Sequence, residues 1–452
     1  MALTYAGWEA MRMGYARRVV SVGNDLTIGG GEVVPEVNYT LPPITITADT
    51  GERVKEQYTR IVEGLLARAA DLAVPQLLLE FEHLPALTLQ NELGTAITRR
   101  TAELLTRQFE EKGLRTALRV TVSDIRDMER PPRVRTGSFL TQMLTAFRDN
   151  ARAGGHLLSI ESTGGKEVHD AALLEANIPG ILFSLGVLAC RDMRALWKQI
   201  VEIAGETGAL PAGDTACGFA NTAMVLADRQ YIPQVLAGVV RAMGAARSLC
   251  AYEVGAVGPS KDCAYEGPVL KALLGIPISM EGKAAACAHL SSVGNVAAAV
   301  CDAWSNESVQ NVPLLSGPAP IAFLEILAYD CRLFNTALAR GEAARLQTWL
   351  TESDLRGSVQ AHLICPEGAF RLAKAIDSAG ERDFQRVRAA ALEACAIMRD
   401  GQERGTLTLS QRELSWLSRI EDALADCDTE DKATAAGMEE YGDRFVPAEY
   451  GL

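Results

Sequence analysis

Segments typical of strands and of helices alternate along the middle of this chain, and this alternation restricts its fold more than any other feature. Short apolar or β-branched runs, such as 77–81 and 116–122, are each followed by a longer segment whose apolar residues recur at helical spacing. Strict alternation of this kind implies a parallel sheet with helical crossovers. Eight strand–helix units are predicted between residues 76 and 339, which favours a closed (β/α)8 TIM barrel over an open doubly wound sheet.

The predicted strands divide the chain into three parts. Strands are predicted at 77–81, 116–122, 156–160, 181–185, 209–212, 248–253, 276–280 and 312–315. We therefore expect the barrel to occupy residues 76–340. Residues 1–75 are expected to form an N-terminal arm and a helix, and residues 341–452 a helical C-terminal extension. A chain of 452 residues accommodates a barrel of about 250 residues together with such additions.

The composition argues against several classes of protein. A formal net charge of −13 argues against binding to nucleic acid or to an anionic membrane surface, because both need a basic face. The N-terminus lacks the apolar segment of a signal peptide. The most apolar stretches, 181–190 and 235–243, are too short or too interrupted to span a bilayer. Ten cysteines without a CxxC pair indicate a reducing compartment, so we expect a cytoplasmic protein.

Reactive side chains gather where the predicted strands end. Because a (β/α)8 barrel builds its active site at the carboxyl ends of its strands, these residues are expected to share one rim: Glu80, Glu82, Asp124, Glu161, Asp214, Cys217, Glu253, Cys263 and Glu281. Carboxylates this close shift one another's pKa or require a cation. One carboxylate and two thiolates suit Zn²⁺ with a fourth position open to substrate. We hypothesise that Glu161, Cys217 and Cys263 bind one zinc ion.

The spacing of these three residues also allows a structural interpretation. Cys217 and Cys263 could be buried loop cysteines, and Glu161 could cap the helix that follows it. Each cysteine, however, follows an aspartate (Asp214, Asp262) in a glycine-containing loop at the start of a helix. Thiolates are stabilised in such places. From the residues alone, both interpretations stay open.

Several long segments resemble one known family. They are LLSIESTGGKEV, AGDTACGFANTAM, SLCAYEVGAVGPSKDCAYE, SMEGKAAACAH and CDAWSNESV. Together with PEVNY near the start and PAEYGL at the end, they are similar to the methanol:corrinoid methyltransferase family, the zinc subunit of methanol metabolism in methanogens and some anaerobic bacteria. The resemblance implies a (β/α)8 barrel with terminal additions and a catalytic zinc whose ligands fall on Glu161, Cys217 and Cys263.

The resemblance also implies a reaction. Zinc would activate the oxygen of methanol as a leaving group, and the methyl group would pass to a Co(I) corrinoid. An acid could protonate the departing oxygen, and the candidates are Glu80, Glu82, Glu253 and Glu281. Each of them could instead form hydrogen bonds at the barrel mouth. Lysines at nearby turns could simply pair with these acids: Lys166, Lys261 and Lys283.

The corrinoid is expected to come from a separate protein. None of the five histidines lies in the Asp-x-His-x-x-Gly frame of a corrinoid-binding module. We therefore expect a corrinoid protein as partner, with the chain in a homo-oligomer or in a hetero-oligomer with that subunit. Alternative interpretations are a related methyltransferase for another C1 donor such as a methoxylated compound, a different metal-dependent barrel enzyme, and a barrel that serves only as a structural subunit.

Overall fold

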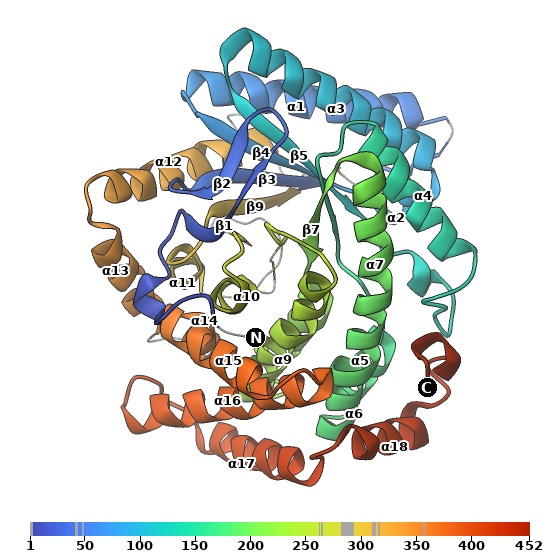
Figure 1. Cartoon of the computed structure of the whole chain (residues 1–452), viewed down its shortest axis with the longest axis vertical. Helices are drawn as coiled ribbons and strands as arrows, with labels where there is room; N and C mark the ends of the chain where they lie inside the picture. The colour runs from blue at the N-terminus through green and yellow to red at the C-terminus, as the bar shows by residue number, and fades with distance from the viewer. Residues whose placement is uncertain are drawn as a thin grey trace.

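A ring of parallel strands forms the centre of the computed structural model (Figure 1). The structure describes residues 3–40, 44–47, 49–261, 263, 265–281, 293–309, 313–314, 317–355 and 358–452. Seven strands pair in the order β7-β6-β5-β4-β3-β9-β8. They are β3 (Val34–Thr40), β4 (Gln76–Glu82), β5 (Arg115–Val122), β6 (Leu157–Ile160), β7 (Leu210–Asp214), β8 (Ser279–Glu281) and β9 (Ala303–Val309).

An irregular segment, residues 257–260, closes this ring between β7 and β8. On one side, the backbone N–H groups of Val257 and Gly258 donate to β7 carbonyl oxygens over 2.8 and 2.7 Å. On the other side, Ser260 forms a parallel bridge with Ile278, just before β8. The segment therefore occupies the eighth strand position. The predicted (β/α)8 class with a helical C-terminal part is confirmed.

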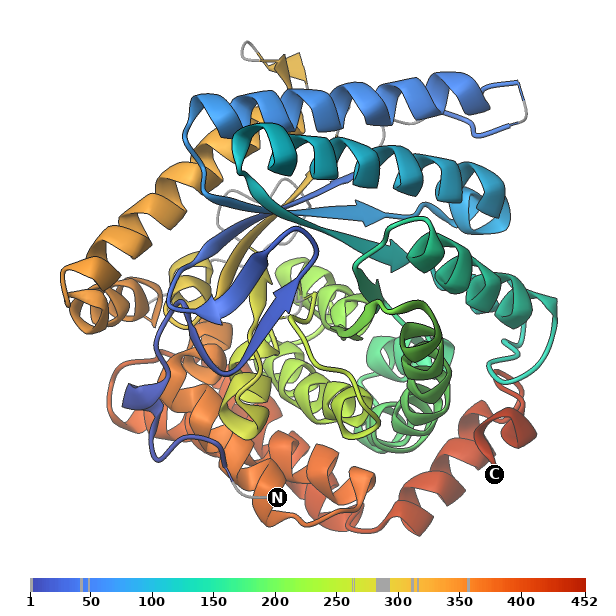
Figure 2. The same ribbon diagram turned by 45° about the horizontal axis from the view of Figure 1, so that its top comes forward.

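Helices cover the outside of the ring (Figures 1 and 2). One main helix follows each strand position in turn: α1 (Gly51–Asp71), α3 (Asn91–Lys112), α4 (Ser138–Arg152), α7 (Cys190–Thr207), α9 (Gln234–Glu253), α10 (Gly267–Leu274), α11 (Gly294–Ala298) and α12 (Ala319–Ala339). Shorter helices lie in the connections: α2 (Pro85–Leu89), α5 (Lys166–Leu174), α6 (Ile178–Phe183), the π-helix η3 (Ser184–Ala189) and α8 (Cys217–Asp228).

Two predicted strands are wrong, because the structure has helices there. Residues 181–185 lie in α6 and η3, where Asn177 caps the helix by accepting the Gly180 N–H and Pro179 occupies its first turn. Residues 248–253 form the end of α9. Both segments are buried on nearly all sides, so they show no helical periodicity that would separate them from a buried strand.

The first and last strands of the ring were also misplaced. β3 belongs to the sheet, between β4 and β9, although residues 34–40 were expected in the N-terminal arm. The sheet therefore begins at Val34, and the expected boundary at 75/76 falls inside it. The last strand is β9, in a part of the chain where no strand was predicted. The strand predicted at 312–315 lies partly outside the described residues, and within these Pro313–Leu314 (β10) pairs with Gly317–Pro318 (β11) and not with the central sheet.

The N-terminal hairpin closes one end of the barrel. It consists of β1 (Tyr15–Val22) and β2 (Leu26–Gly30), preceded by the 3-10 helix η1 (Trp8–Ala10). Two fully buried residues of β2 pack on small or aliphatic residues near the beginnings of the strands: Leu26 and Ile28 contact a cluster of Val34, Leu78, Ala117, Leu157, Ala212 and Ala303. The hairpin therefore covers the end of the barrel where the strands begin and leaves the end where they terminate uncovered by it.

The C-terminal extension packs on α9 and returns to the strand ends. It comprises α13 (Ala343–Leu355), α14 (Val359–Ile364), α15 (Pro366–Ser378), α16 (Asp383–Glu403), α17 (Gln411–Asp426), α18 (Glu430–Tyr441) and η4 (Pro447–Tyr450). α9 is long and apolar enough for a membrane span, but its apolar window is fully buried, partly beneath α16, so it is a core helix of the barrel. The Tyr450 hydroxyl accepts the Gly165 N–H over 3.0 Å and so anchors the loop after β6.

Polar side chains, not aliphatic ones, fill the middle of the barrel. Arg119 on β5 is fully buried and donates to Glu36 on β3 over 2.7 Å. It also donates to the Ser159 hydroxyl over 2.9 Å and to the Pro259 carbonyl over 2.8 Å. These bonds join three strands to the closing segment. Further along the strands, Glu80 and Glu82 on β4 lie beside the inward side chains of Asn38 and Thr121 and form the floor of the candidate site.

Candidate active site

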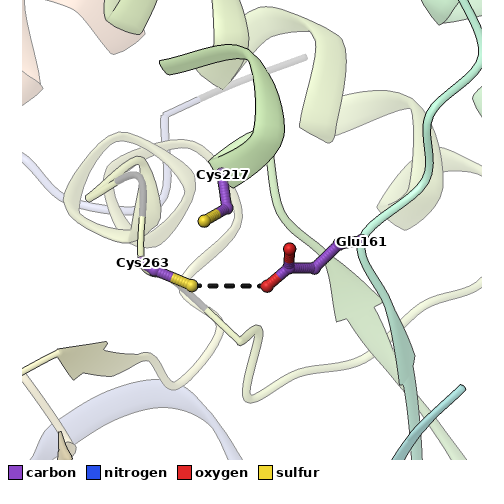
Figure 3. Close-up of side chains that lie close together, drawn as sticks. All are labelled: Glu161, Cys217 and Cys263. Atoms are coloured by element: carbon purple, nitrogen blue, oxygen red, sulfur yellow. Dashed lines mark hydrogen bonds between the residues drawn. The ribbon is translucent and has the colours of Figure 1, made fainter. Parts of the chain in front are cut away.

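Three predicted ligands meet at the carboxyl ends of the strands (Figure 3). Glu161 directly follows β6, Cys217 is the first residue of α8, and Cys263 follows the closing segment. One ligand atom from each lies within 4.8 Å of the other two, and Cys263 Sγ is 3.5 Å from Glu161 Oε1. Ligand atoms around one tetrahedral zinc ion are about 3.3–3.8 Å apart at usual bond lengths. The chain therefore brings together a carboxylate and two thiols at nearly the spacing of a metal site.

Local structure directs the Cys217 thiol into the site. β7 ends at Asp214, and the Cys217 N–H donates to the Thr215 hydroxyl over 3.2 Å. One turn into α8, the side-chain amide of Asn221 donates to Cys217 Sγ over 2.7 Å. A hydrogen bond of this direction and a position at the N-terminus of a 12-residue helix both favour a negative sulfur.

Without a cation, the two thiols favour their protonated forms. The neighbouring Cys263 thiol lowers the pKa of Cys217, but burial and the Glu161 carboxylate outweigh this effect, so the pKa lies well above its usual value. For Cys263, the hydrogen bond with Cys217 and burial both raise the pKa. A bound metal ion would reverse this balance, because its charge deprotonates coordinating thiols.

A buried lysine joins three of the carboxylates. The Lys261 ammonium lies 2.7 Å from Glu161 Oε1, 2.8 Å from Glu82 Oε2 and 3.6 Å from Glu80 Oε1. Burial alone would lower the pKa of Lys261, but the three carboxylates hold the pKa well above its usual value. The suggestion that Lys261 pairs with the acids is therefore confirmed.

The two glutamates of β4 differ in their surroundings. Burial raises the pKa of Glu80, whose side chain is 1% exposed and accepts a hydrogen bond from Thr121 over 2.5 Å. The side chain of Glu82 is 20% exposed. Burial, together with the nearby Glu307, Glu161 and Glu80 carboxylates, raises the pKa of Glu82 to about 8. At neutral pH, Glu82 can therefore hold a proton next to the three ligands.

Comparison with known proteins identifies the family. A family model described as MtaB, the methanol-cobalamin methyltransferase B subunit, matches residues 1–451. This chain belongs to that family. Over 458 aligned residues it is 36% identical to a methanol–corrinoid protein co-methyltransferase from Methanosarcina barkeri (strain Fusaro / DSM 804), with 100% of this chain and 98% of the relative covered. The prediction of a methyltransferase is thereby confirmed.

A solved structure of the family supports the same assignment. The crystal structure of the methanol:cobalamin methyltransferase complex MtaBC from Methanosarcina barkeri matches with a TM-score of 0.95 at 36% identity. The match covers 100% of this chain and 99% of the other. The folds therefore agree over the whole length, including the terminal additions to the barrel.

One further acid of this MtaB family member was not found from the sequence. Glu307 on β9 forms a second group with Cys263 and Glu281, whose ligand atoms also lie within 4.8 Å of one another. Glu281 therefore lies at the site, as expected. Glu307 was missed because its strand was placed too late in the chain. Residues 303–309 read AWSNESV, a mostly polar run without apolar alternation, so no pattern in the sequence marked this strand.

Other members of the predicted rim have structural partners. Asp214 is fully buried and accepts from the Trp197 indole over 2.8 Å and from Arg247 over 3.4 Å. Asp124 pairs with Arg126 over 2.7 Å. Lys166 pairs with Asp170 within α5, not with the acids of the site. Lys283 lies outside the described residues.

Glu253 is not at the site, contrary to expectation. It ends α9, a helix that runs from the rim back toward the opposite end of the barrel, and its carboxylate is held by Arg194 over 2.5 Å and by Arg386 over 2.7 Å.

We expect Glu253→Gln to leave methyl transfer and metal content within about twofold of wild type. Its lost charge-assisted bonds should lower the free energy of unfolding by about 1–3 kcal/mol. Denaturation and turnover assays check this, and loss of bound metal would contradict the placement.

Proposed function

We propose that this chain transfers the methyl group of methanol to the Co(I) corrinoid of a separate corrinoid protein, using zinc held by Glu161, Cys217 and Cys263. The observation that carries the proposal is the convergence of these three ligand atoms within 4.8 Å at the open end of a barrel of the MtaB family. The name of the relative and the complex of the solved structure both point to a corrinoid protein as partner.

The residues at the site fit zinc better than a hard cation. Two of the three donors are sulfur atoms, which select soft or borderline metals. Cys217 and Cys263 are 6% and 3% exposed, while the Glu161 side chain is 30% exposed, so the site opens on the carboxylate side. A three-ligand site with one open side is typical of catalytic zinc, and closed four-ligand sites are typical of structural zinc.

The residues around the ligands have distinct tasks in this mechanism. When bound, zinc acts as a Lewis acid that stabilises the oxygen leaving the methyl carbon. Lys261 fixes one oxygen of Glu161, and Asn221 fixes the Cys217 sulfur, so both ligands are oriented before substrate arrives. The buried floor of the site excludes bulk water, which is a competing nucleophile and a source of protons.

Glu82 is the best placed of the four candidate acids. Asn38 and Lys261 both donate to its Oε2 atom, over 2.7 and 2.8 Å, so a proton on this carboxyl group would lie on Oε1. Burial and the neighbouring carboxylates raise its pKa in the metal-free chain, and its side chain is more accessible than that of Glu80. Glu82 can therefore protonate the departing oxygen.

The proposal is tested on the purified full-length chain. We expect about one zinc per chain by elemental analysis. With methanol, the zinc-loaded protein should convert Co(I) corrinoid to methyl-Co(III), followed by its absorbance spectrum. Removal of zinc by a chelator should abolish conversion, and added zinc should restore it. Absence of both tightly held zinc and methyl transfer would refute the proposal.

A further inference from the structure

Lys261 is a buried cation in contact with the acidic cluster around the proposed zinc ligands. Its side chain is 5% exposed, and its ammonium nitrogen lies within 4 Å of carboxylates from β4 and from the end of β6. It lies two residues before Cys263, on the segment that closes the barrel. A single side chain thus touches one proposed ligand, Glu161, and the candidate acid, Glu82.

The ion pair between Lys261 and Glu161 affects the net charge around the proposed zinc ion. One carboxylate and two thiolates around Zn²⁺ carry a formal charge of −1, and this excess of negative charge weakens a Lewis acid. The Lys261 ammonium group, 2.7 Å from Glu161, places a positive charge beside this ligand set and offsets part of the excess. In a buried site a charge at this distance acts strongly, because solvent screens it poorly.

A second buried lysine shows what a purely structural arrangement looks like in this protein. Lys271 is fully buried on α10 and donates to the Arg12 and Val300 carbonyl oxygens over 2.9 Å each, as well as to Asp302 over 3.0 Å. Its ammonium group joins the N-terminal segment to the barrel through backbone groups. Lys261 instead contacts carboxylates of the site, among them the proposed ligand Glu161 and the candidate acid Glu82.

We propose that Lys261 is a positioning residue that holds Glu161 in place and compensates the negative charge of its ligand set, so that the bound metal stays electrophilic. This inference rests on the proposed zinc-dependent function. It assigns to Lys261 a role in turnover beyond that of a buried salt bridge. The lysine acts through Glu161 and needs no contact with methanol.

The test compares Lys261→Met with Lys261→Arg in the full-length protein. We expect Lys261→Met to keep about one zinc per chain at saturating zinc but to lose about 10–100-fold in turnover, the usual cost of removing a partner of a metal ligand. Lys261→Arg restores a positive charge and should recover part of that loss. In the Co(II)-substituted protein, the sulfur-to-cobalt charge-transfer band should shift in Lys261→Met and return toward wild type in Lys261→Arg.

Two further variants separate charge from folding. Lys261→Met combined with Glu80→Gln removes one buried negative charge as well, so it should fold more stably than the single variant and regain part of its turnover. Lys271→Met is the matched control: it should lower the melting temperature but leave turnover and the Co(II) spectrum of the folded protein unchanged.

The outcomes distinguish this inference from the proposed function. If wild-type protein holds no zinc and transfers no methyl group, the proposed function fails. If wild type is active while Lys261→Met matches it in turnover and spectrum, the inference about Lys261 alone is refuted. A turnover loss that neither Lys261→Arg nor Glu80→Gln relieves would refute it as well.

Discussion

Cys217→Ala is expected to leave the chain folded but without a firmly bound zinc ion and without methyl transfer. Cys217 supplies one of only three proposed ligands, and the Asn221 amide that orients its sulfur would lose its acceptor. Loss of a ligand should exceed the roughly 10–100-fold cost of removing a ligand's partner. Since the change removes one buried atom at the start of α8, the free energy of unfolding should fall by about 1 kcal/mol.

Elemental analysis, the methyl transfer assay and thermal unfolding check this prediction on the same preparation. Cys395→Ala is the matched control, because Cys395 is also buried but lies on α16 in the C-terminal extension. The control should keep zinc and turnover. Full metal content in Cys217→Ala would show that the ligand set is wrong, whatever the effect on activity.

The sequence predicted the site better than it predicted the strands that build it. Glu161 and Cys217 follow strands that were predicted nearly correctly, so their place on the rim followed from the strand positions. Cys263 was assigned to the rim from the strand predicted at 248–253, which is helical, and it lies at the site because the irregular segment 257–260 takes the eighth strand position. The prediction that Glu253 lies on the rim was wrong because residues 248–253 are helical, and a helix that follows a strand runs away from the rim. The chain position of a residue therefore identifies the rim reliably where the element type is right, and by chance where it is wrong.

Contacts between distant segments were beyond the reach of pattern analysis. The resemblance to the family suggested three ligands, but the distances from Lys261 to Glu82 and Glu161 depend on how the closing segment lies between β7 and β8. That segment has one parallel bridge and lacks the alternation of a regular strand. β3 was likewise hidden, because Glu36 and Asn38 point into a polar barrel interior and give the strand no apolar inner face.

Arg126→Met is expected to destabilise the protein by about 3–5 kcal/mol, the usual cost of breaking a buried ion pair from one side. Arg126 is 1% exposed and lies between two buried carboxylates, at 2.7 Å from Asp124 and 2.7 Å from Asp192. Asp124 also accepts the Thr163 N–H over 2.9 Å, two residues after Glu161. The substitution should therefore also loosen the loop that carries this ligand and reduce zinc retention.

The pH dependence of this loss tests its electrostatic origin. Burial alone would raise the pKa of Asp124, but Arg126 outweighs it and holds the pKa below its usual value. In wild type, Asp124 thus contributes stability above its unfolded pKa of about 3.9, and this contribution is lost as the pH falls through the lower folded pKa. Without Arg126, burial dominates and the folded pKa rises above the unfolded value. The loss in free energy of unfolding of Arg126→Met relative to wild type should then be largest at neutral pH. This loss should become smaller as the pH falls toward 4. Urea denaturation at several pH values measures the free energy of unfolding of both proteins.

The control is Arg133→Met, which removes an exposed pair with Glu129 in the loop between β5 and α4 that also carries Arg126. It should lower the free energy of unfolding by less than about 1 kcal/mol at every pH. A penalty for Arg126→Met that stays constant with pH would point to lost packing, not to the uncompensated carboxylates.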